Sequence, residues 1–469
     1  MSFVETYQNL ELLRFLTCGS VDHGKSTLIG RLLYDSRNVP DDHAATARRH
    51  TARYGSTSTD LDFAMLVDGL RAEREQGITI DVAYRYFATA KRKFIIADAP
   101  GHEQYTRNMA TGASHCDLAL VLVDVREGIV EQTRRHAFIA ALLGIRHMVV
   151  AVNKMDLAAF DERRFEEVRR DFVDFCTRLE VTDVEFIPIS ASNGDNVVER
   201  SAAMPWYRGR PLLDYLENVH VASDRNLIDL RFPVQLTLRS GDTRHLAGTI
   251  ASGVMRTGDE VVVLPSLRRA HIASLAAGGQ GVAEAFAPMA VTATLDRDVD
   301  VSRGDLIAHV RNVPTLEREL EAMVVWMDES PLAAGREYLL KHATASIPCK
   351  VSDVRYRVDV QELRHHAAAQ LALNEIGRVR LATARPIAFD SYARNRAMGS
   401  FILIDRLTNA TAGAGMILDR EAADRAQPEP RKVRRADASR VLRWSGTTAP
   451  APAAETRSPS GGAREKRTS

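Results

Sequence analysis

The sequence contains only four cysteines in 469 residues, and no two of them form a Cys-x-x-Cys pair. Such scattered thiols argue against a zinc site and against the disulfide framework of a secreted protein. The apolar runs are all shorter than the roughly 20 residues that a membrane-spanning helix needs. We therefore expect a cytoplasmic protein with reduced thiols and without a membrane partner.

A strong overall charge is also missing. The chain has 62 basic and 61 acidic residues, a formal net charge of +1, so nothing marks nucleic acid as its main partner. The charge is uneven, because 11 Lys/Arg stand against 6 Asp/Glu from Glu421 onward. This last segment is rich in Ala, Pro, Arg and Gly and has few large apolar residues. We expect a disordered basic tail over residues 420–469.

The most informative stretch is a glycine-rich turn between an apolar run (12–18) and a helical pattern that places Leu28, Leu32 and Leu33 on one face. This is the arrangement of a phosphate-binding loop, in which backbone N–H groups and a helix N-terminus surround phosphate oxygens. Lys25 would reach the β- and γ-phosphates, and the Ser26 hydroxyl would ligate magnesium. The predicted loop comprises Gly19, Ser20, Val21, Asp22, His23, Gly24, Lys25, Ser26 and Thr27.

The pattern of apolar and turn-forming residues changes once along the chain. Short apolar runs alternate with amphipathic helical patterns from about residue 13 to 219, which predicts an α/β domain with a mostly parallel sheet. After about residue 226, short β-rich runs between turn signals predict antiparallel β-barrels. The expected domains are a phosphate-loop domain at 1–222, two β-barrels at 227–312 and 315–419, and the tail at 420–469.

Two further motifs contribute to the predicted phosphate end of the site. Gly77-Ile78-Thr79-Ile80 places Thr79 in a loop that would close on magnesium and the γ-phosphate. Asp98-Ala99-Pro100-Gly101-His102 follows an apolar run, and such residues lie at strand ends, where α/β sheets bind their ligands. Asp98 would hold magnesium through water, and the Gly101 N–H would contact the γ-phosphate.

The identity of the bound base is indicated by two motifs that come later in the chain. In Asn153-Lys154-Met155-Asp156, the Asp156 carboxylate would accept from both the ring N–H and the exocyclic amine of guanine, a pair that adenine does not offer. Asn153 would help to hold the base edge, and the Lys154 stem would cover its face. Ser190-Ala191 would donate a backbone N–H to the guanine carbonyl. Five motifs in this order indicate a GTPase.

The two histidines of these motifs receive different predictions. His102 directly follows the glycine that would contact the γ-phosphate, where a group that orients the attacking water is needed. The expected catalytic residues are therefore His102, Thr79 and Lys25. His23 has no evident role inside the phosphate loop, and we expect it to be a partly exposed loop residue.

Three of these motifs resemble those of the translation-factor class of GTPases: the phosphate loop, Gly77–Ile80 and Asp98–His102. Longer segments at 7–15, 98–114, 232–259 and 401–417 are similar to the GTP-dependent large subunit of bacterial sulfate adenylyltransferase. That resemblance implies a GTPase domain followed by two β-barrels, with GTP and Mg²⁺ bound. It also implies a smaller catalytic subunit as partner, which makes adenosine 5′-phosphosulfate and pyrophosphate from ATP and sulfate, driven by GTP hydrolysis. One departure is His23, where a second aspartate is expected in this branch.

Two other functions are compatible with parts of the sequence. A translation elongation factor that delivers aminoacyl-tRNA shares the domain plan, but it would need basic barrels, and the chain before residue 420 is mildly acidic. Some relatives of the resembled family carry an adenylylsulfate kinase after the barrels. No second Gly-Lys-Ser/Thr follows the barrels here, so we expect no fused kinase domain.

Overall fold

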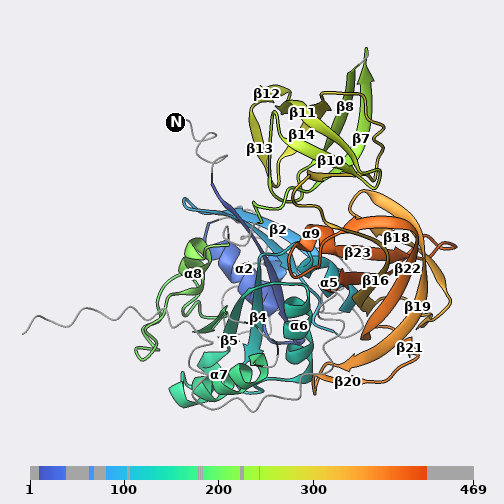
Figure 1. Ribbon diagram of the computed structural model, residues 1–469. Coiled ribbons are helices and arrows are strands. Elements are labelled where there is room, and N and C mark those ends of the chain that lie inside the picture. Colours follow the sequence, from blue (N-terminus) through green and yellow to red (C-terminus); the bar gives the residue numbers. More distant parts are fainter. Residues whose placement is uncertain are drawn as a thin grey trace, which may run out of the picture.

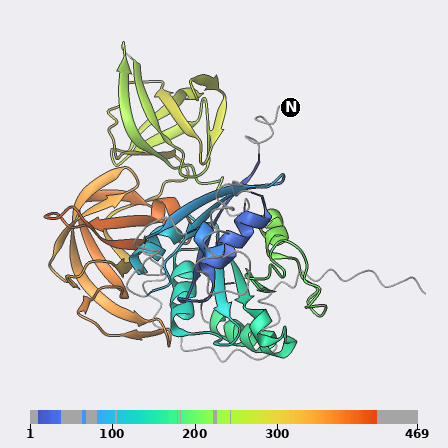
Figure 2. The same cartoon turned by 180° about the vertical axis from the view of Figure 1, so that it is seen from behind.

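The computed structural model describes residues 10–37, 63–67, 81–102, 106–177, 179, 181, 183–221, 226–241 and 243–419. An α/β domain lies beside one β-barrel, and another β-barrel adjoins them both (Figures 1 and 2). The predicted Thr79 and the predicted tail at 420–469 lie outside the described residues.

The α/β domain is built on one six-stranded sheet in the order β2-β3-β1-β4-β5-β6. Every neighbouring pair is parallel except β2 with β3, so the carboxyl ends of β1, β3, β4, β5 and β6 meet at one edge. Strand β4 is buried along its whole length, as expected for a central strand covered on both faces. The strands are β1 (Leu12–Gly19), β2 (Ala83–Ala88), β3 (Lys93–Asp98), β4 (Leu118–Asp124), β5 (His147–Asn153) and β6 (Asp183–Pro188).

Helices pack on the two faces of this sheet through separate apolar cores. Leu28, Ile29 and Leu32 of α2 contact one face, and Phe165, Val168 and Phe172 of α7 contact the other. The helical elements are α2 (Lys25–Asp35), η1 (Phe63–Leu66), α5 (Thr106–Ala113), α6 (Glu131–Leu142), η3 (Met155–Ala158), α7 (Glu162–Cys176) and α8 (Leu212–Asn218).

The first barrel is a closed antiparallel sheet in the order β10-β15-β7-β8-β14-β11, with β11 pairing back to β10. Closure leaves few free sheet edges, and the apolar side chains of alternate residues fill the interior. Its strands are β7 (Phe232–Ser240), β8 (Thr243–Thr249), β9 (Val254–Arg256), β10 (Glu260–Leu264), β11 (Arg268–Ala277), β12 (Gln280–Val282), β13 (Glu284–Phe286), β14 (Ala290–Leu295) and β15 (Leu306–His309).

The second barrel closes in the order β18-β23-β24-β16-β22-β19, with β19 pairing back to β18. The predicted fold, an α/β phosphate-loop domain followed by two antiparallel barrels, is confirmed. The elements are β16 (Thr315–Trp326), β17 (Leu332–Ala333), β18 (Glu337–His342), β19 (Ala345–Asp359), β20 (Arg364–His366), β21 (Gln370–Leu371), β22 (Ile376–Phe389), α9 (Arg396–Gly399), β23 (Ser400–Ile404) and β24 (Thr411–Ile417).

The second barrel packs directly on the α/β domain. Met323 and Val325 of β16 join the same buried cluster as Met109 of α5, and the Tyr392 hydroxyl donates to the Leu143 carbonyl at 2.7 Å. Because α5 begins just after the motif that contains His102, this interface lies close in sequence to the predicted catalytic loop.

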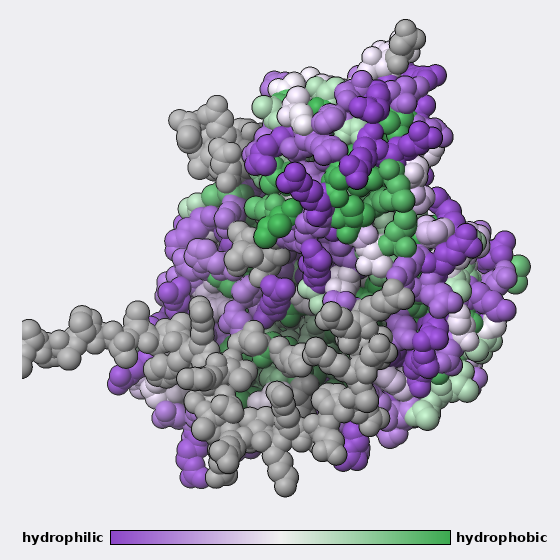
Figure 3. All heavy atoms as spheres, in the orientation of Figure 1, coloured by the Kyte–Doolittle hydropathy of each residue, from purple (hydrophilic) through white to green (hydrophobic). Residues whose placement is uncertain are grey.

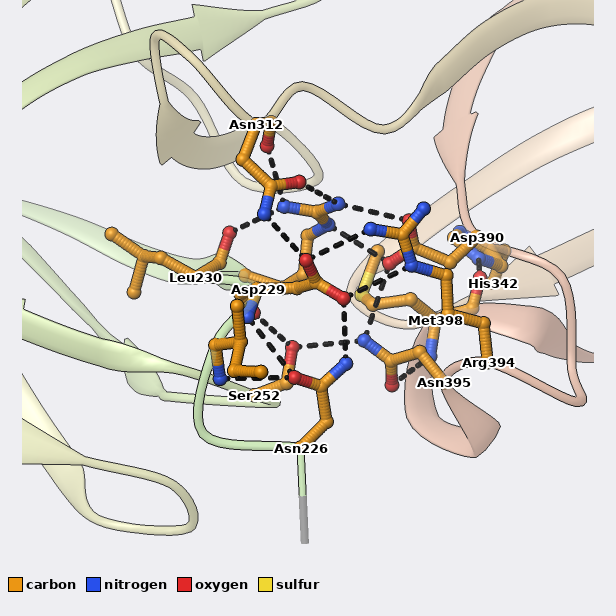
Figure 4. Close-up of polar contacts among 12 residues, drawn as sticks. Asn226, Asp229, Leu230, Ser252, Asn312, His342, Asp390, Arg394, Asn395 and Met398 are labelled. Carbon is orange, nitrogen blue, oxygen red and sulfur yellow. Dashed lines mark hydrogen bonds and ion pairs between the residues drawn. The ribbon is translucent and has the colours of Figure 1, made fainter.

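The two barrels are joined by crossed ion pairs (Figure 4). Fully buried Arg231 donates to both oxygens of Asp390 at 2.8 and 2.9 Å, and Arg394 donates to both oxygens of Asp229 at 3.0 and 2.9 Å. Burial alone would raise the pKa of Asp229, but hydrogen bonds from Arg394 and two asparagines hold it well below its ordinary value. Each barrel supplies one acidic and one basic residue, so the joint is charge-balanced.

Hydrophilic side chains cover most of the coloured surface in Figure 3, and a hydrophobic patch lies at the end of the first barrel that faces the rest of the chain. None of the helices in the described ranges is long and apolar enough to cross a membrane.

Candidate functional site

The loop between β1 and α2 has the backbone shape of a phosphate-binding loop. Asp22 and Gly24 adopt left-handed conformations, with φ of 64° and 90°, which bend the chain before the helix starts. Lys25 opens α2 and is only 7% exposed. Its Nζ donates to the carbonyls of Gly19 and Ser20 at 3.0 and 2.8 Å. The ammonium is therefore held against the loop, at the place where phosphates would lie.

The Asp98–His102 segment lies against this loop. A Cβ at Gly101 would be 2.5 Å from Lys25 Nζ and 2.9 Å from the Val21 nitrogen, so only glycine allows this approach. Asp98 is buried, and its Oδ1 accepts from the Thr17 hydroxyl at 2.8 Å. Burial lowers the pKa of Lys25, an effect that the charge of Asp98 opposes. Asp98, Gly101 and Lys25 thus lie together, and their contacts with phosphate and magnesium stay predictions.

Two oxygen ligands of the kind that magnesium prefers lie near this loop. Ser26 lies in the first turn of α2 and is partly exposed, and Asp98 supplies a carboxylate. Magnesium is usually held by one or two such oxygens together with phosphates and water. Among the described residues no group of three or more His, Cys, Asp or Glu is arranged to hold a metal by itself.

The base-binding motif is internally braced. The Asn153 amide donates to the His23 carbonyl at 2.9 Å, and its oxygen accepts from the Ala191 N–H, also at 2.9 Å. Asn153 therefore joins the phosphate loop to the Ser190-Ala191 loop, whereas the sequence-based prediction placed it on the base edge. The predicted donor to the guanine carbonyl is a backbone N–H of Ser190-Ala191, and in this structure the Ala191 N–H donates to Asn153 Oδ1. Its contact with a base stays a prediction.

The remaining members of the base motif face the same edge of the sheet. Asp156 Oδ1 accepts from the Ser190 hydroxyl at 2.6 Å, which orients the carboxylate that would read guanine. Lys154 adopts a left-handed conformation with φ of 62°, and its Nζ lies 3.0 Å from Asp124 Oδ2. The motif residues are thus positioned by neighbouring side chains.

The predicted exposure of His23 is wrong, because its side chain is fully buried. Its Nδ1 donates to the Leu122 carbonyl at 3.0 Å, and its Nε2 lies 3.2 Å from Glu127 Oε2. The ring packs between the phosphate loop and the end of β4. A polar residue in a glycine-rich loop gave no sign of this, because the partners come from residues about 100 positions later.

His136 is a site residue that the sequence analysis missed. It lies on α6, is fully buried, and its Nδ1 accepts from the Gly19 N–H at 3.1 Å. That acceptor must be unprotonated, and burial lowers the pKa of His136 to about 3. A single histidine on the inner face of a helix usually indicates core packing, so the sequence held no specific signal.

The structure describes two of the three predicted catalytic residues, Lys25 and His102. His102 follows Gly101 and is partly exposed. Residues 103–105 and Thr79 lie outside the described residues. The roles of His102 and Thr79 stay predictions.

Comparisons with known proteins identify families and single proteins that are similar to this chain. The family model described as "Elongation factor Tu GTP binding domain" matches residues 10–224, and "GTP-eEF1A C-terminal domain-like" matches residues 319–418. The chain is 50% identical to sulfate adenylyltransferase subunit 1 of Alteromonas mediterranea, covering 92% of each chain. It is 55% identical to the bifunctional enzyme CysN/CysC of Rhodopirellula baltica over 89% of this chain, spanning 65% of that protein's length. Among solved structures, a sup35 complex with GDP covers 89% of this chain and 96% of its own at 22% identity, with a TM-score of 0.41.

Proposed function

Because the chain belongs to the sulfate adenylyltransferase subunit 1 family, we propose that it is the GTP-hydrolysing subunit of a sulfate adenylyltransferase in sulfate assimilation. The observation that carries the proposal is one edge of the sheet at which a phosphate loop around Lys25 meets the Asn153–Asp156 motif. The 50% identity over 92% of each chain supports the proposal that this site is that of this branch of the GTPases. We place the protein in the cytoplasm, without nucleic acid as partner.

Within the site, each group has one task. The loop N–H groups and Lys25 bind the β- and γ-phosphates, and the Asp156 carboxylate selects guanine over adenine. Ser26, Asp98 and Thr79 would hold Mg²⁺, which supplies positive charge to the phosphates when bound. His102 would orient the water that attacks the γ-phosphorus. Asn153, His23 and His136 hold the loops in place.

The proposed complex joins two reactions. A sulfate oxygen attacks the α-phosphorus of ATP, which forms adenosine 5′-phosphosulfate and releases pyrophosphate. The phosphosulfate anhydride is high in energy, so this reaction is unfavourable by itself, and hydrolysis of GTP to GDP and phosphate would pull it forward. The sequence holds one phosphate loop, at residues 19–26. We therefore assign ATP and sulfate to a smaller partner subunit.

The test is steady-state phosphate release from GTP by the full chain, alone and with the small sulfurylase subunit. We expect slow turnover by the chain alone and faster turnover with the partner, ATP and sulfate. Stabilisation completed by a partner is worth about 10³–10⁵ in rate in GTPases that use it. His102→Ala should lose the stimulated rate and keep GTP affinity, whereas the matched control His115→Ala, an exposed histidine, should keep both.

Two results would overturn the proposal. One is full turnover by the isolated chain, unchanged by the partner and its substrates. The other is stimulation by aminoacyl-tRNA and ribosomes in place of the sulfurylase subunit, which would indicate a translation factor.

A further inference from the structure

Asp124 ends β4 at the edge of the sheet where the nucleotide would bind, yet it belongs to none of the five motifs. Its side chain is fully buried. Oδ1 accepts from the backbone N–H and the Nε of Arg126 at 2.9 and 3.1 Å, and Oδ2 accepts from the second guanidinium nitrogen at 2.7 Å. A buried carboxylate needs such partners, because an isolated buried charge is strongly destabilising.

The remaining partner of Asp124 is a motif residue. Lys154 Nζ lies 3.0 Å from Asp124 Oδ2. Lys154 adopts the left-handed conformation between β5 and η3. Its side chain as a whole is 24% exposed, and its ammonium is held by the buried carboxylate.

We propose that Asp124 is a positioning residue for the guanine nucleotide, acting by anchoring Lys154 so that its aliphatic stem covers the base. The inference rests on the proposed GTP-binding function and extends it to a residue outside the motifs. An unanchored lysine would lose side-chain freedom on binding the base, which costs affinity. Anchoring before the nucleotide arrives removes most of that cost.

Arg126 orients the Asp124 carboxylate that anchors Lys154. Its guanidinium binds Asp124 with two hydrogen bonds, the geometry that gives arginine–carboxylate pairs their strength. Its backbone carbonyl accepts from Arg164 of α7 at 2.8 Å, which fixes the turn after β4. The next residue is Glu127, whose Oε2 lies 3.2 Å from Nε2 of His23 in the phosphate loop. The short turn 124–127 thus contacts both the phosphate loop and the base motif.

The test is a double-mutant cycle on the full chain, with the Kd and dissociation rate of a fluorescent GDP analogue as readouts. Asp124→Asn removes the charge at nearly constant shape. Lys154→Met removes the ammonium, keeps the stem, and changes a loop residue, so it is expected to fold. We expect each variant to raise Kd about tenfold, mainly through faster dissociation, and the double variant to be no weaker than either one. The maximal GTP turnover rate should stay within twofold while KM rises.

Asp117→Asn is the matched control. Asp117 precedes the same strand at its opposite end, where its carboxylate accepts from the Arg14 N–H, and the substitution should leave GDP affinity unchanged. Additive losses in the cycle, or GDP binding of Lys154→Met equal to wild type, would overturn the anchoring role while leaving the proposed function intact. Failure of the wild-type chain to bind GDP would instead overturn the proposed function.

Discussion

We expect the stability of the phosphate loop to depend on pH through His136. Its Nδ1 accepts the Gly19 N–H at the end of β1, so the folded state requires the neutral ring. Burial, with a smaller contribution from the charge of Lys25, lowers its pKa from 6.5 to about 3. Because the pKa of His136 is lower in the folded state, its contribution to stability is complete above 6.5, the pKa of the unfolded state. That contribution is lost as the pH falls from 6.5 towards 3.

The size of the effect depends mainly on the unfolded pKa. Between pH 7 and pH 5 the locally opened state gains protons on His136 that the folded state does not bind. Proton linkage with a pKa of 6.5 then gives about a 25-fold loss of protection, or about 2 kcal/mol. Because the folded pKa lies well below 5, its exact value hardly changes this result.

Hydrogen exchange on the full chain measures this locally, which matters because a chain with several domains need not unfold in one step. Protection of amides in β1 and α6 is compared at pH 7 and pH 5 after correction for intrinsic exchange rates. His136→Asn keeps an acceptor near the Nδ1 position but does not titrate. We expect it to have lower protection at pH 7 and to lose about 25-fold less between the two pH values than wild type.

His115→Asn, at an exposed position, should follow the wild-type profile and so controls for loss of any histidine. An equal pH dependence in wild type and His136→Asn would refute the reasoning. It would mean either that the ring is protonated in the folded state or that its hydrogen bond to Gly19 does not contribute to holding the loop.

Three other substitutions test separate parts of the structure. Asp156→Asn should weaken GTP about 10- to 100-fold and favour xanthosine triphosphate, because an amide can accept only one of the two guanine donors; calorimetry showing unchanged GTP affinity would contradict the assignment. Lys25→Ala should weaken GTP by a similar factor while the circular-dichroism spectrum stays that of wild type, and a lost spectrum would point to a role in folding. Asp390→Ala leaves buried Arg231 without its carboxylate, a change that costs about 3–5 kcal/mol; thermal unfolding at an unchanged temperature would show that the barrels do not depend on this pair.

The motifs of the proposed phosphate site could be recognised in the sequence because their chemistry is local. Gly101 illustrates this, since a glycine is needed wherever one loop closes on another and a Cβ would meet Lys25 at 2.5 Å. The fold could be predicted for a similar reason, because apolar periods and turn residues are properties of short segments. Strand order within the barrels could not, because pairing joins residues far apart in sequence, as β10 with β15 does.

Buried polar residues outside the motifs could not be predicted. Arg231 would ordinarily be placed at the surface, yet it is fully buried because Asp390, 159 residues later, accepts from it. Asp124 and His136 are similar cases, since each depends on a partner from another segment. A single sequence shows the type of a residue but not the distant group that makes its burial favourable.

Asn153 shows the same limit inside a motif. Its position in Asn-Lys-x-Asp suggests contact with the base, but its amide bonds to the His23 carbonyl and the Ala191 N–H. A binding site needs residues that keep its loops ordered before the ligand binds, because loops that become ordered only on binding reduce affinity. Asn153 makes such bracing contacts with two loops, and it lies in the same short motif as Asp156. The bracing contacts could be found only in the structure, because their partners come from other segments of the chain.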